Sequence, residues 1–201
     1  MVGPARRANF SAKGTVGLEN MAKNIVQAWL GDNFYQLAPE LQQIHTKGGV
    51  LVGEIDVILG TGISKFIGQR LAKKLNIPGA GKMQLKVDIS HDEQALYWRR
   101  VFNGTHQVES IFQPQGTQQH GYWLETTGPL TMKLTVDVVD SAWHWRCLGF
   151  KFLGVPLPVW LFPQSKAYKR IENGQYRFFV GFHAPLFGHL LSYSGLLQVQ
   201  S

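Results

Sequence analysis

Hydrophobic positions after residue 82 mostly repeat every second residue, a pattern typical of β-strands. In MQLKVDI, residues 83–89, apolar side chains alternate with polar ones, so we expect one buried and one solvated face. Similar segments follow to the end of the chain and make roughly nine strands of ordinary length. Asn103-Gly104 and Asn173-Gly174 are dipeptides typical of two-residue hairpin turns. The pattern therefore predicts a long antiparallel meander, which tends to curl or close because open edges invite aggregation.

Before residue 82 the spacing of apolar residues changes from one segment to the next. Apolar residues between Ile25 and Ile44 recur every three to five positions and predict two short helices that meet near Pro39. Residues 51–59 alternate and predict a strand. The segment 153–164 contains three prolines, so it is not a central strand. We expect residues 159–162 to form an apolar plug or a single helical turn over one end of the sheet; the alternative is an exposed loop that contacts a membrane or forms a portal.

Residues 63–75 predict an amphipathic basic helix. Five apolar residues should share its buried face: Ile63, Phe66, Ile67, Leu71 and Leu75. The lysines and the arginine lie mostly elsewhere on the helix. Two interpretations remain open: a helix packed on the sheet with solvated lysines, which we favour, or a lid or helix that contacts an anionic surface.

These elements predict an α+β domain over residues 21–201. N-terminal helices would pack on or cap a strongly curved antiparallel sheet of roughly eight to ten strands, or a closed calycin-like barrel. The alternative is a START-like helix-grip fold, which usually has a long C-terminal helix, whereas this chain ends in a strand pattern. Residues 1–20 are basic and rich in small residues, and we interpret them as a flexible leader. This leader is either native or was added upstream of a natural start at Met21.

Composition narrows the class of partner. Charged residues make up only 16% of the 201-residue chain, yet the formal net charge is +7, which favours anionic partners such as acidic small molecules or an anionic membrane. The basic residues form no stripe, which argues against nucleic acid. One cysteine, Cys147, and the lack of a secretory signal or a long apolar run predict a cytoplasmic location, either free or peripheral to the inner membrane.

No motif assigns a reaction or a cofactor. The chain has no phosphate-binding glycine loop, no dinucleotide fingerprint and no nucleophile elbow. Its seven histidines are scattered, and with a single cysteine we expect no metal site. Whether the protein is an enzyme stays open at this level.

One strand carries the most informative side chains. In ALYWRRVF, Trp98, Arg100 and Phe102 share a face, and an arginine between two aromatics is held by stacking and by its apolar stem. If that face is interior, the guanidinium needs a partner, because an unpaired buried charge is costly. Glu125 is the best candidate. Either the two form a structural pair, or Arg100 faces the carboxylate or phosphate of an apolar ligand.

Several short motifs, taken in order, resemble one family. They include GEIDVILGTG at 53–62, YWRRVFNG at 97–104, LETTGPL at 124–130 and APLFGHLLSYSGLL at 184–197. From about residue 24 to its end, the chain resembles the bacterial domain-of-unknown-function 4166 family (DUF4166). The resemblance matches Trp98, Arg100, Phe102, Glu125 and Tyr193 to family motifs and implies no activity. Because the family also occurs fused behind Rossmann-type dehydrogenase-like domains, it points to a dehydrogenase-like protein as a partner.

Three functions remain open. The first is binding of an apolar or amphipathic, lipid-like small molecule, with or without an acidic head group, in a cavity of the sheet near Trp98, Arg100, Phe102, Glu125 and Tyr193. The second is an enzyme, or an accessory domain of an oxidoreductase, that acts through an Arg100, Glu125 and Tyr193 pocket. The third is a structural or protein-interaction module.

Overall fold

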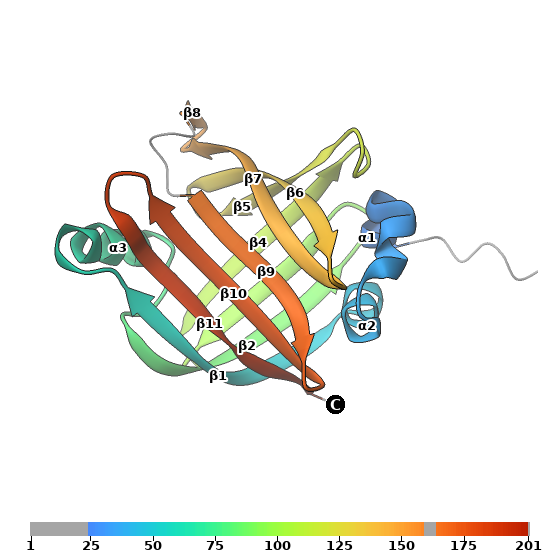
Figure 1. Ribbon diagram of the computed structural model, residues 1–201, viewed down its shortest axis with the longest axis horizontal. Coiled ribbons are helices and arrows are strands. Elements are labelled where there is room, and N and C mark those ends of the chain that lie inside the picture. The colour runs from blue at the N-terminus through green and yellow to red at the C-terminus, as the bar shows by residue number, and fades with distance from the viewer. Residues whose placement is uncertain (1–23, 159–163, 201) are drawn as a thin grey trace, which may run out of the picture.

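The computed structural model describes residues 24–158 and 164–200, and their strands form a β-barrel with helices at its two ends (Figure 1). The helical elements are α1 (Ile25–Leu30), the 3-10 helix η1 (Gly31–Gln36), α2 (Pro39–Lys47) and α3 (Gly62–Lys74). The strands are β1 (Gly49–Leu59), β2 (Gly81–His91), β3 (Leu96–Phe102), β4 (His106–Gln115), β5 (Tyr122–Thr127), β6 (Leu130–Val139), β7 (Ala142–Phe152), β8 (Val155–Leu157), β9 (Gln164–Glu172), β10 (Gln175–Ala184) and β11 (Gly188–Gln200). The apolar plug expected at residues 159–162 lies outside the described residues.

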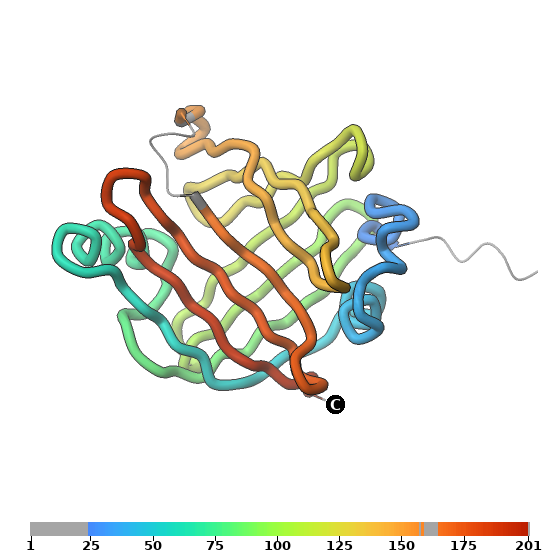
Figure 2. The backbone as a smooth tube through the Cα atoms, in the orientation of Figure 1, coloured from blue at the N-terminus to red at the C-terminus, as the bar shows by residue number. Residues whose placement is uncertain are grey.

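Neighbouring strands pair antiparallel along the chain, and the last returns to the first. β11 pairs with β1 in a register that places Tyr193 opposite Val57, and Figure 2 shows these two strands side by side. β9 pairs with β7, so the short β8 sits outside the ring on the far part of β7. The closed ring therefore has ten strands, β1 to β7 and β9 to β11.

This architecture confirms the predicted antiparallel barrel and fits a calycin-like fold. The START-like alternative is not confirmed, because the last element of the described chain is the strand β11 rather than a long helix. Both predicted hairpins are present. Asn173 and Gly174, with φ of +50° and +75°, form the predicted two-residue turn between the paired residues Glu172 and Gln175. The first hairpin has one more residue than predicted, because Phe102 pairs with His106 and Thr105 joins Asn103 and Gly104 in the turn. Asn103 and Gly104 still have positive φ, +45° and +72°.

Alternation along each strand fills the barrel with apolar side chains. In β2 the odd positions from Met83 to Ile89 are buried, as predicted, whereas Gln84 and Lys86 are exposed. At one end of the barrel, α1 and α2 pack against the strand ends (Figure 1): Trp29 lies against Trp123 with ring centroids 5.4 Å apart. The core thus extends from the barrel interior into the helices that cover this end.

The helix α3 lies at the opposite end, and its predicted orientation is partly wrong (Figure 1). Ser64, Gly68 and Ala72 face the barrel, whereas Ile63 and Phe66 are exposed. A Cβ atom on Gly68 would lie only 2.0 Å from a backbone carbonyl oxygen of β11. The helix therefore approaches the strand through its small residues, and this contact turns two of the apolar side chains outward. No helix in the described ranges is long and apolar enough to span a membrane.

Candidate functional site

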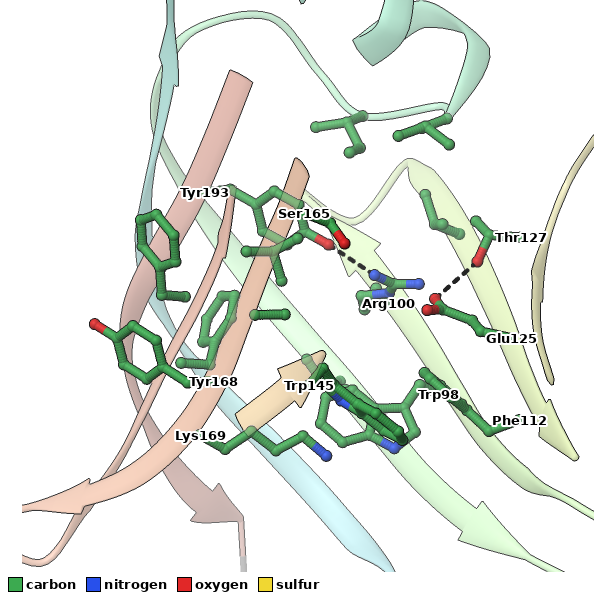
Figure 3. Close-up of a pocket in the computed structure, with 18 of the residues that line it drawn as sticks. Trp98, Arg100, Phe112, Glu125, Thr127, Trp145, Ser165, Tyr168, Lys169 and Tyr193 are labelled. Carbon is green, nitrogen blue, oxygen red and sulfur yellow. Dashed lines mark hydrogen bonds between the residues drawn. The ribbon is translucent and has the colours of Figure 1, made fainter. Parts of the chain in front are cut away.

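The barrel interior contains a cavity with about 80 Å³ open to the centres of water-sized atoms (Figure 3). Most lining side chains are aliphatic or aromatic and come from strands all around the ring. Three lining residues have acidic or basic side chains: Arg100 of β3, Glu125 of β5 and Lys169 of β9.

Arg100 points inward because β3 alternates, and the adjacent Arg99 points out. Arg100 donates one hydrogen bond of 2.8 Å to the Tyr193 hydroxyl and another to the Ser110 hydroxyl. Arg99 is exposed and forms an ion pair with Glu109 at 2.7 Å. The two neighbouring arginines therefore have different environments, one inside the barrel and one in water.

Glu125 lies beside Arg100 but makes no direct ion pair with it. Its Oε1 atom accepts hydrogen bonds from Ser110 at 2.8 Å and from Thr127 at 3.1 Å, so Ser110 bridges the carboxylate and the guanidinium. Burial raises the pKa of Glu125, and the Arg100 cation opposes that rise. The expected partnership thus exists as a hydrogen-bonded network with a hydroxyl between the two charges.

Of the five residues chosen from the sequence, four line the cavity: Trp98, Arg100, Glu125 and Tyr193. Phe102 does not. It is fully buried and packs edge-on against Tyr193, with ring centroids 6.0 Å apart, so it supports the hydroxyl that receives the Arg100 hydrogen bond. Burial raises the pKa of the Tyr193 hydroxyl, which therefore stays protonated.

Lys169 is the cavity residue that sequence reasoning missed. It is only 4% exposed, and its amine lies 3.9 Å, 4.4 Å and 5.5 Å from the ring centroids of Trp98, Trp143 and Trp145. The faces of these indoles stabilise an ammonium where water is excluded. Figure 3 shows the side chain reaching across the floor of the cavity toward Trp98 and Trp145.

His45 of α2 completes this second polar cluster. A 3.3 Å contact joins its Nε2 atom to the amine of Lys169, and its ring stacks on Trp143 with centroids 4.7 Å apart. Burial lowers the pKa of both groups well below their ordinary values. The Lys169 amine lowers the pKa of His45 further, so a positive charge on both groups at once is disfavoured.

The alternation of inward and outward positions along β9 could have identified Lys169 as a cavity residue. Ala167 and Ile171 mark the inward face of QSKAYKRIE, and Lys169 lies between them at the same period. Ser110 has a similar signature, since it lies between the inward-facing Val108 and Phe112 of β4. A polar residue in the middle of an apolar strand face thus marks both Lys169 and Ser110.

Three donor groups on cavity residues have no partner among the described residues. They are the indole N–H of Trp98, the Nε–H of Arg100 and the hydroxyl of Tyr176. A buried donor without an acceptor costs free energy, so such groups call for an explanation. A bound molecule that carries acceptor oxygens would satisfy them.

The described side chains assemble no cluster of three or more His, Cys, Asp or Glu residues that could hold a metal ion. Cys147 of β7 lies near the cavity wall, and burial raises its thiol pKa to about 11, so it is a poor nucleophile near neutrality. The chemistry that this interior offers is therefore recognition of apolar surface, together with the cation of Arg100 and hydrogen bonding from Arg100, Glu125 and Lys169.

The comparisons with known proteins agree with the sequence resemblance. No match to this chain was found among curated proteins. A family model described as "Domain of unknown function (DUF4166)" matches residues 37–197, a span that contains α3, every residue of the Arg100 network and the ring strands except the last three residues of β11. The chain belongs to this family, DUF4166.

Proposed function

We propose that the barrel binds an amphipathic small molecule, with an apolar body in the cavity and an acidic head group near Arg100. The observation that carries this proposal is the set of unpartnered donors on Trp98, Arg100 and Tyr176 in an otherwise apolar cavity. Unpartnered donors on the cavity lining favour a ligand with acceptor oxygens, and the aliphatic and aromatic lining favours an apolar body.

The charges of the lining favour an anion over a neutral head group. Glu125 is the only acidic residue among the lining residues, and its raised pKa extends the pH range in which it is neutral. The guanidinium of Arg100 lies beside it and lines the same cavity. A ligand carboxylate would therefore compensate the Arg100 charge whenever Glu125 holds its proton.

Decanoate and decanol, which differ only in the head group, are matched probes for this proposal. We expect decanoate to bind more tightly when titration is followed by tryptophan fluorescence and 1:1 binding is confirmed by native mass spectrometry. Arg100→Met should weaken decanoate binding at least about tenfold, the loss of one charged hydrogen bond, and should leave decanol binding within about twofold. Arg99→Met is the control, since that arginine faces water. Absence of binding for both probes, or equal decanoate affinity in the two variants, would contradict the proposal.

A second candidate is an acid–base enzyme, and one observation favours it. Glu125 combines a raised pKa with a place on the cavity wall, which is the environment of many catalytic carboxyl groups. A suitable reaction class is proton transfer at the carbon next to a ligand carbonyl. Incubation of 2-decanone in D₂O, followed by NMR, tests it: exchange by the wild type that Glu125→Gln abolishes would support an enzyme, and no exchange between pH 5 and 9 would exclude this reaction.

A further inference from the structure

Four large apolar side chains are exposed at the α3 end of the barrel. Ile63 and Phe66 of α3 are 66% and 55% exposed, and Leu186 and Phe187 of the β10–β11 turn are 88% and 43% exposed. Monomeric soluble domains seldom leave such side chains together in water unless the patch has a partner. The sequence pattern assigns Ile63 and Phe66 to a buried face, which makes their exposure more informative.

The two segments form one surface. The Ser64 hydroxyl donates a hydrogen bond to the backbone carbonyl of Phe187, and the amide of Gly60 donates to the carbonyl of Leu190 at 2.9 Å. Figure 1 shows α3 and the β10–β11 turn at the same end of the barrel. We name Ile63, Phe66, Leu186 and Phe187 the apolar tip.

Cationic side chains surround the apolar tip. On the helix, Arg70, Lys73 and Lys74 are exposed and follow Phe66 at helical spacing, so they lie on the same side of α3. The Arg70 guanidinium lies over the Phe66 ring, 4.4 Å from its centroid. No acidic residue occurs between Asp56 and Asp88 to balance these charges. The β10–β11 turn likewise contains no acidic residue.

We propose that this end of the barrel docks on an anionic lipid bilayer, with the apolar tip in the headgroup region and the α3 cations on the lipid phosphates. Apolar side chains beside a cationic helix face are the combination that interfacial membrane binding uses. Each lysine or arginine near an anionic surface adds attraction that corresponds to about a fivefold change in affinity. A protein partner would need acidic groups matched to these positions, whereas an anionic bilayer supplies them everywhere.

The docked orientation would bring the cavity close to the membrane. Leu75 and Ile77 come directly after α3, and both line the cavity. The same end of the barrel therefore carries the apolar tip on its outside and cavity wall on its inside. Membrane docking would place this wall nearest to a supply of amphipathic molecules.

Flotation of the full chain with vesicles tests the proposal. We expect binding to phosphatidylcholine vesicles that contain about one third phosphatidylglycerol, weak binding to pure phosphatidylcholine, and loss of binding between 0.1 M and 0.5 M salt as screening increases. Lys73→Gln should reduce binding about fivefold. Lys86→Gln, on the exposed face of β2, is the matched control and should have no effect.

The apolar contribution has its own pair of variants. Leu186→Ser with Phe187→Ser should abolish most binding, whereas Tyr35→Ser, which alters an exposed aromatic residue 59% accessible in η1 at the other end of the barrel, should not. An unchanged thermal midpoint for each variant shows that the barrel is intact, and decanoate binding measured separately distinguishes this proposal from that of the cavity ligand. Equal binding to both vesicle types, no binding to either, or variants that bind like wild type would overturn membrane docking.

Discussion

Replacement of Arg100 by methionine is the sharpest test of the interior network. The change keeps an unbranched apolar stem but removes the guanidinium that donates to Tyr193 and Ser110. Hydrogen bonds to a charged group contribute about 1.5–3 kcal/mol each, and part of that loss is offset because no cation has to be kept out of water. We expect the free energy of unfolding to fall by about 2–3 kcal/mol, which lowers the thermal midpoint of a chain of this length by roughly 4–12 °C.

The loss should also depend on pH. Glu125 holds its proton in the folded protein to a higher pH than in the unfolded chain, where its ordinary pKa is 4.5, so stability falls as pH rises between those two values. Arg100 opposes the rise in that pKa, and its removal therefore extends the fall to higher pH. Arg100→Met should accordingly cost more stability at pH 8 than at pH 5, and a further Glu125→Gln change should remove the difference.

Urea unfolding followed by tryptophan fluorescence at pH 5 and pH 8 measures both effects. Arg99→Met is the control, and because its ion pair with Glu109 is exposed, its cost should stay between about 0 and 1 kcal/mol. The reasoning is refuted if Arg100→Met is as mild as Arg99→Met at both pH values. It also fails if the loss is independent of pH and Glu125→Gln gives no relief, because Arg100 would then not be balancing that carboxyl.

Three further predictions concern the rest of the interior. Burial lowers the pKa of Lys169, so the wild type should become more stable as pH rises toward the unfolded pKa of 10.5. Lys169→Met should lose this rise in the urea midpoint, while Lys166→Met on the outer face keeps it. Gly68→Ala should destabilise by more than about 2 kcal/mol in thermal melts, because its Cβ would lie 2.0 Å from a β11 carbonyl oxygen, whereas Gly79→Ala meets open space and should be tolerated. With a thiol pKa of about 11, Cys147 should react with iodoacetamide at pH 8 about a hundredfold more slowly than a free thiol, and rapid labelling of the folded protein would contradict its burial.

Local sequence determined the strands, their inward faces and two of their turns. The period-two pattern of residues 83–89 assigned the buried side of β2, and Asn103-Gly104 assigned a hairpin, because both depend on side-chain alternation and on backbone conformations that neighbouring residues favour. The same alternation separated Arg100, which faces inward, from Arg99, which faces water.

Only the tertiary structure decided how these faces meet. Closure by β1 and β11 brings Tyr193 to Arg100, although 93 residues separate them, and the β7–β9 pairing brings Lys169 under three indoles. The outward rotation of Phe66 likewise follows from the contact of Gly68 with β11. Periodicity along one element reports which residues share a face, but which other element covers that face depends on contacts between residues far apart in the chain, and local spacing carries no record of them.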